Sequence, residues 1–292
     1  MANFTDLFKQ YDTKLDDATV KQDIEKILAA HYAENDNADV YKKCLNLIDL
    51  TSLNGTDTDS EIAAMTQKVN DFKRKFPHLP NVAAICVYPA LVPMVKKQLT
   101  EKVGIAAVSA GFPASQTFIE IKIAETAMAV AAGATEIDIV ISIGKMLDGD
   151  YEDLYEELTE IKAACRNAHL KIILETGALQ TATNIKKASL IAMAAGADFI
   201  KTSTGKIPVA ATLEATYIMC HAIKEWDAKN KVAVGYKPAG GIVTTEDAVQ
   251  HYTLVKEILG KEWLNNELFR FGASRLANNL LTSIEGKEIK YF

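Results

Sequence analysis

The sequence has few cysteines and histidines, and they do not form the groups that bind metals or build redox centres. The four cysteines, Cys44, Cys86, Cys165 and Cys220, are far apart and include no C-x-x-C pair, which is typical of reduced thiols in the cytosol. The five histidines are also scattered, without an H-x-H or H-E-x-x-H group. The sequence therefore predicts no metal, no cofactor and a cytoplasmic location.

Long apolar runs and an excess of positive charge are also missing. Residues 1–17 carry an acid before any apolar run, so we do not expect a signal peptide. The apolar stretch IAMAAGA, residues 191–197, is too short to span a membrane. The formal net charge of −6 argues against nucleic acid or an acidic membrane as the main partner.

Short runs rich in Val and Ile alternate with segments of helical period along most of the chain. The runs occupy residues 44–50, 81–87, 104–110, 136–142, 171–177, 198–204, 232–238 and 268–274. Segments such as 115–133, 153–168 and 243–260 read as helices, and Thr244 with Asp247 forms a capping-box pattern. Eight strands alternating with helices predict an α/β protein with a (β/α)₈ TIM barrel over residues 41–292. A doubly wound open sheet is the competing architecture, but it normally has fewer strands.

The first forty residues precede this pattern. Residues 16–33 have a helical composition, so residues 1–40 are predicted to form an N-terminal helical extension that covers the barrel bottom or an interface. No low-complexity linker separates the two parts.

Strand ends supply the candidate functional residues, because barrel enzymes place their chemistry at the C-terminal ends of the strands. The candidates are Asp49, Thr51, Cys86, Asp138, Lys201, Lys237, Gly240, Gly241, Gly272 and Ser274. Charged residues inside apolar strands are costly unless they are paired or used. Asp138, Lys201 and Lys237 are such residues. One alone could pair with a neighbouring helix or reach solvent, but three on strands 4, 6 and 7 favour a shared site.

Lys201 and Lys237 lie on neighbouring predicted strands, which are about 4.8 Å apart. If both side chains face inward at one level, their ammonium groups come within ~5–7 Å. Their repulsion is then about 3 kcal/mol at an effective dielectric constant of ~20, or roughly 2 pKa units. One lysine would be partly neutral near neutral pH and therefore nucleophilic toward carbonyls. Two coupled lysines and an acid are the components of Schiff-base chemistry.

Loops of small residues follow the last three strands. They are STGK (203–206), PAGG (238–241) and GAS (272–274). Each could be a simple tight turn, but three in succession favour a phosphate site, because glycine lets backbone N–H groups approach an anion. The first is not a Walker A loop, since Ile207 follows Lys206.

Seven stretches together make the chain resemble the deoxyribose-phosphate aldolase family of class I aldolases. They are IDLTSLNGTDTD (48–59), NVAAICVYP (81–89), TEIDIV (135–140), KIILETG (171–177), GADFIKTSTGK (196–206), GYKPAGG (235–241) and FRFGAS (269–274). The resemblance implies a (β/α)₈ barrel without metal that interconverts 2-deoxy-D-ribose 5-phosphate with D-glyceraldehyde 3-phosphate and acetaldehyde. The expected partners are thus small phosphosugars and aldehydes.

The resemblance also assigns residues. Lys201 resembles the Schiff-base lysine, Lys237 the lysine that perturbs it, and Asp138 the acid/base that works through water. Two further sets line the pocket and bind phosphate by resemblance, namely Asp49, Thr51 and Cys86, and Gly205, Lys206, Gly240, Gly241 and Ser274.

Three positions need separate treatment. Val243 stands where similar sequences carry Arg, and Arg275 stands where a second Ser usually follows GAS. We expect Arg275 to compensate for Val243 at the phosphate. Family members can bring a tail tyrosine to the pocket, which makes Tyr291 a candidate, although a disordered terminus is the competing interpretation.

Other functions stay open at this point. One is a different Schiff-base sugar-phosphate lyase. A second is a non-catalytic phosphosugar-binding barrel, against which Asp138 argues because a carboxylate weakens anion binding. A third is a zinc-dependent aldolase, against which the scattered histidines argue. The sequence also leaves open whether the chain forms a homo-oligomer.

Overall fold

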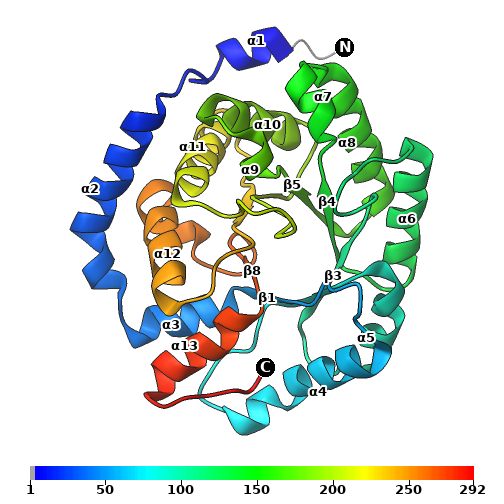
Figure 1. Cartoon of the computed structure of the whole chain (residues 1–292), viewed down its shortest axis with the longest axis vertical. Helices are drawn as coiled ribbons and strands as arrows, with labels where there is room; N and C mark the ends of the chain where they lie inside the picture. The colour runs from blue at the N-terminus through cyan, green and yellow to red at the C-terminus, as the bar shows by residue number, and fades with distance from the viewer. Residues whose placement is uncertain (1–3) are drawn as a thin grey trace.

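Eight parallel strands form a single sheet in the computed structural model, which describes residues 4–292. They are β1 Ile48–Thr51, β2 Ala84–Val87, β3 Gly104–Val108, β4 Glu136–Val140, β5 His169–Ile173, β6 Phe199–Lys201, β7 Gly235–Lys237 and β8 Phe271–Ala273. The order is β7-β6-β5-β4-β3-β2-β1-β8, and bridges join Tyr236 to Phe269 and Ala239 to Gly272. These bridges connect the two edges of the sheet, so the predicted (β/α)₈ barrel is confirmed (Figure 1).

Helices surround the strands and connect them. They are α4 Asp59–Lys75, α5 Val92–Gln98, α6 Ile119–Ala131, α7 Ile143–Asp148, α8 Tyr151–Cys165, α9 Thr176–Leu179, α10 Ala182–Ala194, α11 Leu213–Asn230, α12 Thr245–Leu259 and α13 Arg275–Glu285, with the short 3₁₀ helices η1 Pro89–Leu91 and η2 Lys261–Trp263. The capping box predicted at the start of α12 is present, because Thr244 and Asp247 each bond the other's backbone N–H. No helix within residues 4–292 has both the length and the hydropathy to cross a membrane.

The boundaries predicted for the first strand are wrong. Residues 44–46 belong to the last turn of α3 (Ala38–Asn46), and β1 begins at Ile48. Cys44 and Leu45 are buried by helix packing, and a short buried helical turn has the same apolar composition as a buried strand. The fifth strand was also placed too late, since β5 ends at Ile173 and Thr176 already begins α9.

The N-terminal extension lies along the side of the barrel and not across its bottom. It contains α1 (Phe4–Lys9) and α2 (Asp17–Asn35), and α2 runs along the outside of α11 and α12 (Figure 1). The Asn35 side chain donates to Thr253 Oγ1 at 3.2 Å. Residues 1–3 of the predicted extension lie outside the described residues. The expected boundary between residues 40 and 41 falls inside α3.

The barrel interior has an apolar side and a charged side. On β2 and β3, Ala84, Cys86, Ala106 and Val108 form a small apolar cluster with Leu53. The interior-facing residues of the remaining strands include the buried charged groups Asp49, Glu136, Asp138, Lys171, Lys201, Lys237 and Arg270. Buried charges are stable only when they are paired. We therefore looked for the functional site on this charged side of the interior.

Candidate active site

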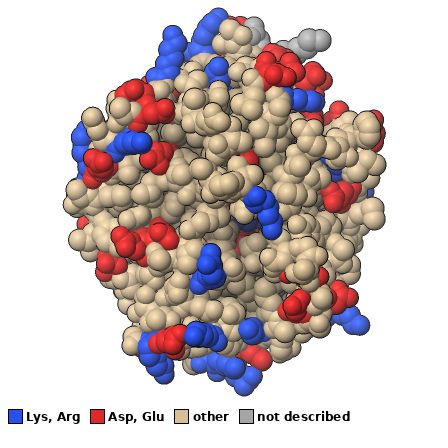
Figure 2. All heavy atoms as spheres, viewed as in Figure 1, with Lys and Arg blue, Asp and Glu red and all other residues tan. Residues whose placement is uncertain are grey.

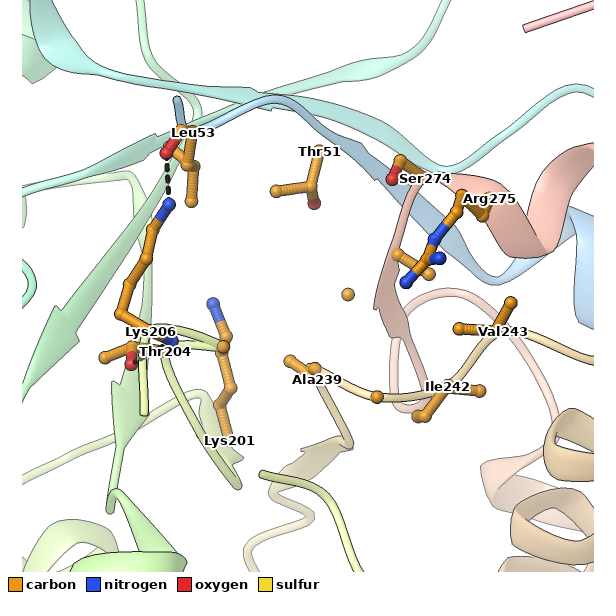
Figure 3. Close-up of a pocket in the computed structure, with 15 residues that line it drawn as sticks. Thr51, Leu53, Lys201, Thr204, Lys206, Ala239, Ile242, Val243, Ser274 and Arg275 are labelled. Atoms are coloured by element: carbon orange, nitrogen blue, oxygen red, sulfur yellow. Dashed lines mark hydrogen bonds between the residues drawn. The ribbon is translucent and has the colours of Figure 1, made fainter. Parts of the chain in front are cut away.

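A cavity of about 190 Å³ opens at the C-terminal ends of the strands. It is lined by Thr51, Leu53, Lys201, Thr204, Gly205, Lys206, Ala239, Gly240, Gly241, Ile242, Val243, Gly272, Ala273, Ser274 and Arg275. Figure 2 shows a hollow near the centre of this face with basic side chains on either side of it. Lys201 points into the cavity from below, and the glycine-rich loops enclose it (Figure 3).

Asp138 lies at the centre of the charged groups beneath this cavity. Its Oδ2 accepts hydrogen bonds from Lys201 Nζ and Lys237 Nζ, each at 2.8 Å. Lys201 and Lys237 are also paired in register on β6 and β7. The two nitrogens are therefore no more than twice 2.8 Å apart, and the prediction that both lysines face inward at one level is confirmed.

A buried ion network extends below Asp138. Asp49 accepts from Lys237 Nζ and, at 2.6 Å, from Arg270 Nη1. Arg270 Nη2 donates to Glu136 Oε1 at 3.0 Å. Lys171 joins the set through Asp138 Oδ1 at 2.8 Å and Glu136 Oε2 at 2.6 Å.

Three carboxylates and four basic side chains make up this network. The carboxylates are Asp49, Glu136 and Asp138, and the basic groups are Lys171, Lys201, Lys237 and Arg270. With every group ionised, the buried network carries one positive charge in excess. Because an uncompensated buried charge is costly, the loss of one proton from one lysine relieves the excess.

The pKa shifts identify the lysine that loses its proton most readily. Burial lowers the pKa of Lys201; Asp138 opposes this shift, and the charge of Lys237 adds to it. Burial also acts to lower the pKa of Lys237, but Asp138 and Asp49 together outweigh it and the pKa is raised. The two lysines thus differ because Lys237 has two carboxylate partners and Lys201 has one. The predicted direction for Lys201 is right, but burial is the leading cause and the neighbouring cation comes second.

Asp138 itself stays ionised. Burial acts to raise its pKa, yet Lys171, Lys201 and Lys237 hold that pKa well below its usual range. A carboxylate in this state accepts hydrogen bonds from both lysines at once and is suited to receive a proton only transiently.

Sequence reasoning missed Glu136, Lys171 and Arg270. Each is a charged residue within or beside a run that was read as a buried strand, in EIDIVIS, KIILETG and FRFGAS. Glu136 and Lys171 are the first residues of their predicted strands, but Lys171 lies in the middle of β5 and is fully buried. The same argument that selected Asp138, a charge inside an apolar strand, could have found all three.

The three residues expected to line the pocket divide into two groups. Thr51 lines the cavity, whereas Asp49 and Cys86 lie beneath it with no exposed surface. Cys86 packs in the small apolar cluster of the barrel interior, and burial raises the pKa of its thiol. The expectation that Asp49 and Cys86 line the pocket is therefore wrong, because Asp49 contacts Lys237 beneath the cavity and Cys86 packs on the apolar side of the interior.

All five residues expected at the phosphate end line the cavity, namely Gly205, Lys206, Gly240, Gly241 and Ser274. Gly240 is required by close packing between the β6 and β7 loops. A Cβ at this position would lie 2.8 Å from Ala210 Cβ and 2.9 Å from Gly205 Cα, and its φ is +82°. A side chain would thus force the two loops apart.

Residues at this end of the cavity have backbone N–H groups without an acceptor. Among residues 4–292, no acceptor bonds the N–H groups of Gly205, Gly241 and Ser274. The N–H of Gly240 is directed at the carbonyl of Gly272 at the long distance of 3.5 Å. Ser274 is also the N-cap of the 11-residue helix α13. Free N–H groups and a helix N-terminus favour an anion.

Arg275 and Lys206 add basic groups on opposite sides of the cavity. The Arg275 side chain extends from the start of α13 toward Val243 (Figure 3). No carboxylate of the described chain forms a salt bridge with Arg275. Lys206 Nζ donates to the carbonyl oxygen of Leu53 (Figure 3).

Tyr291 is not among the residues that line the cavity. Its hydroxyl donates to the carbonyl of Lys68 at 2.6 Å, and its ring packs against Phe72 and Phe76 of α4. The backbone N–H groups of Tyr291 and Phe292 donate to Asn278 Oδ1 at 2.9 Å. The tail is therefore docked on the outside of the barrel.

One group among the described residues has the spacing of a metal site. His31, Glu34 and Glu257 lie between α2 and α12 with their ligand atoms within 4.8 Å of one another. Lys256 Nζ already lies 2.5 Å from Glu34 Oε1. None of these residues lines the cavity. That the chemistry needs no metal stays a prediction.

The fold and the site define a (β/α)₈-barrel protein with a buried lysine pair beneath a cationic cavity at the C-terminal ends of its strands. Residues 43–260 match the model of the DeoC/LacD family aldolases, and the chain belongs to that family.

Similar proteins support this membership. The chain is 44% identical over 254 residues to the human protein deoxyribose-phosphate aldolase, covering 82% of this chain and 78% of that protein. The mouse protein of the same name is also 44% identical over 254 residues, with the same two coverages. The fold is similar to that of a tetrameric deoxyribose phosphate aldolase from Aeropyrum pernix, with a TM-score of 0.68 at 22% identity over 87% of this chain and 97% of that chain.

Proposed function

We propose that this protein is a class I aldolase that reversibly cleaves 2-deoxy-D-ribose 5-phosphate to D-glyceraldehyde 3-phosphate and acetaldehyde through a Schiff base on Lys201. The names of the human and mouse relatives support the substrate. The observation that carries the mechanism is that Lys201 and Lys237 share one oxygen of Asp138, while the pKa of Lys201 is lowered and that of Lys237 is raised.

The neutral amine of Lys201 is the nucleophile. It attacks C1 of the open-chain sugar, water leaves from the carbinolamine, and an iminium forms. The iminium draws electrons from the C2–C3 bond, which breaks as the C3 hydroxyl gives up its proton and becomes the aldehyde of the released D-glyceraldehyde 3-phosphate. The enamine that remains takes a proton at C2, and hydrolysis releases acetaldehyde and regenerates the amine.

Asp138 and Lys237 support these proton transfers. Asp138 Oδ2 contacts Lys201 Nζ directly, so it is placed to receive the proton that Lys201 loses on addition and to return it on elimination. Lys237 stays protonated because Asp49 and Asp138 both bond it. Its charge keeps Asp138 ionised and lowers the pKa of Lys201.

The phosphate group of the substrate would occupy the part of the cavity that the glycine-rich loops line, away from Lys201. The N–H groups of Gly205, Gly241 and Ser274 have no acceptor in the described chain, and a dianion would satisfy them. Lys206 and Arg275 would supply the countercharge. A sugar held in this way at its C5 end would extend toward Lys201 with its C1 end.

Trapping of the Schiff base tests the proposal. Acetaldehyde and borohydride should reduce the imine to a stable ethyl adduct, which mass spectrometry of the digested protein should locate on Lys201. The Lys201→Ala variant should give no adduct and no turnover, while Lys97→Ala, which removes an exposed lysine outside the cavity, should behave as the parent protein does. An adduct on Lys206 or Lys237 would show that the nucleophile is wrongly assigned. No adduct at all would favour a non-catalytic phosphosugar-binding barrel.

We further infer that the protein acts in the cytoplasm, in the breakdown of nucleosides, and that it self-associates. The four cysteines are buried and unpaired, as in proteins of a reducing compartment. The tetrameric state of the Aeropyrum pernix protein supports self-association.

A further inference from the structure

A further cavity, of about 240 Å³, lies beside helix α12 and is called the α12 cavity below. It is lined by Asn35, Val40, Lys43, Tyr252, Lys256, Lys261 and Leu264. Helix α12 packs against α2, α3 and η2, which supply the other walls (Figure 1). Val243 lines the catalytic cavity just before α12 begins, whereas Lys256 lies in the last turn of that helix. The helix separates the two cavities by about 20 Å, so the α12 cavity is a distinct site.

Asn35 is fully engaged with groups of the protein itself. Its Nδ2 donates to the carbonyl oxygen of His31 at 2.9 Å and to Thr253 Oγ1 at 3.2 Å. Its Oδ1 accepts from Lys256 Nζ at 3.0 Å, so Asn35 holds that lysine in place. No carboxylate lines the α12 cavity. The polar groups left for a ligand are three lysines and one tyrosine hydroxyl, which all donate hydrogen bonds.

The hydroxyl of Tyr252 is the most telling of these donors. Tyr252 is only 2% exposed, yet no group within residues 4–292 bonds its hydroxyl. Burial, with a smaller effect of Cys44, raises the pKa of Tyr252 to about 12, so the hydroxyl keeps its proton. A buried tyrosine hydroxyl usually has a hydrogen-bond partner. An unmatched donor on a cavity wall therefore points to an acceptor supplied by a ligand.

The lysines give this ligand its charge. Lys256 is largely neutralised, because its Nζ lies 2.5 Å from Glu34 Oε1 and 3.7 Å from Glu257 Oε1. Lys43 and Lys261 are exposed and form no ion pair with any residue of the described chain. Two positive charges without a countercharge beside an unmatched donor favour a dianion.

We propose that the α12 cavity binds a phosphate group, either as the free ion or as part of a small phosphomonoester. A phosphate dianion carries several acceptor oxygens, which Tyr252 and the two unpaired lysines can bond together. The α12 cavity is larger than the catalytic cavity, at about 240 Å³ against 190 Å³, so it has room for the group that a phosphomonoester carries. The proposal does not depend on the aldolase reaction, since the two cavities share no residue.

Brief acetylation of the lysines tests the proposal at each site. Mass spectrometry of the digested protein measures how fast each lysine is modified, with and without inorganic phosphate or glycerol 3-phosphate. Both compounds should slow the modification of Lys43 and Lys261 severalfold. Lys97 is the internal control, because it is exposed and lines neither cavity. Chloride at equal ionic strength controls for screening. Protection by either phosphate compound supports the site, and the compound that acts at the lower concentration identifies the source.

Two matched variants separate the hydroxyl from the lysines. Tyr252→Phe removes only the hydroxyl and should raise the concentration for half-protection on the order of tenfold, since a hydrogen bond to a charged group is lost. Tyr155→Phe removes a hydroxyl on α8, outside the α12 cavity, and should leave that concentration unchanged. Far-UV circular dichroism shows whether each variant is folded. Equal slowing at Lys97, equal slowing by chloride, or an unchanged concentration in Tyr252→Phe would each overturn the proposal.

Discussion

Lys201 and Lys237 occupy paired positions on β6 and β7 and donate to the same oxygen of Asp138, yet their pKa values are shifted in opposite directions. The difference comes from Asp49, which bonds Lys237 and not Lys201. One carboxylate below the pair thus determines which amine is free to react. The consequences can be measured by replacing Lys237 and Asp138 in turn.

Replacement of Lys237 by Leu should move the pH–rate profile to higher pH. The charge of Lys237 lowers the pKa of Lys201, so its removal lets that pKa rise. Lys201 must be neutral to react, and the ascending limb of kcat/KM should therefore shift toward alkaline pH, with a lower rate at pH 7. Lys206→Leu removes a lysine that lines the same cavity and should not move this limb. An unmoved limb in Lys237→Leu would contradict the electrostatic role.

Replacement of Asp138 by Asn should move the same limb in the opposite direction. The charge of Asp138 raises the pKa of Lys201, so a neutral amide should let that pKa fall further. At the same time kcat should drop by about two to four orders of magnitude, because the proton acceptor is lost. Circular dichroism should show an intact fold. A slower enzyme whose limb shifts to higher pH would mean that Asp138 acts in some other way.

Arg275→Ser should raise KM for 2-deoxy-D-ribose 5-phosphate by roughly ten- to a hundredfold. The guanidinium lies at the end of the cavity where we propose that phosphate binds (Figure 3), and a charge-assisted hydrogen bond contributes about 1.5–3 kcal/mol. The unphosphorylated sugar should change far less, since it offers no charge to Arg275. Steady-state kinetics with the two substrates side by side give the comparison. Equal small effects on both would place Arg275 in a purely structural role.

Deletion of Tyr291 and Phe292 should lower stability and leave the chemistry intact. The Phe292 ring stacks on Phe72 at 5.4 Å, and Tyr291 bonds the carbonyl of Lys68. Loss of these partly exposed contacts should reduce the free energy of unfolding by about 1–2 kcal/mol. Denaturant unfolding and kcat of the truncated chain measure the two effects. A large fall in kcat at unchanged stability would show instead that Tyr291 leaves α4 and reaches the pocket during turnover.

His251 should make stability fall between pH 6.5 and pH 4. Burial lowers the pKa of its imidazole from 6.5 to about 4 in the folded chain, and Thr216 Oγ1 bonds its Nδ1 at 2.7 Å. The unfolded chain therefore binds the proton first as the pH drops, which costs up to about 3 kcal/mol of folding free energy by pH 4.

The His251→Asn variant isolates this contribution. It should show a smaller slope of unfolding free energy against pH than the parent protein in the same window, while both slopes agree above pH 7. Identical slopes throughout would rule out His251 as the source of the pH dependence.

Local patterns in the sequence were sufficient to predict the order of the eight strands. Buried parallel strands are apolar on both faces, so each appears as a run of Val and Ile residues, and a charge within such a run is conspicuous. This is why Asp138, Lys201 and Lys237 were found. The last turn of α3 was misread because Cys44 and Leu45 are equally apolar when buried in a helix.

The sequence alone thus determined three features: the barrel, the common level of the two lysines on neighbouring strands, and the small-residue loops above them. Each of these depends on residues that are close together in the chain. The tertiary structure decided which lysine loses its proton and where the tail lies. Arg270, the residue before β8, reaches Asp49 across 221 positions, and Asp49 reaches Lys237 across 188 positions. Electrostatic interactions depend on distance in space and on burial, and neither is encoded in the spacing of residues along the chain.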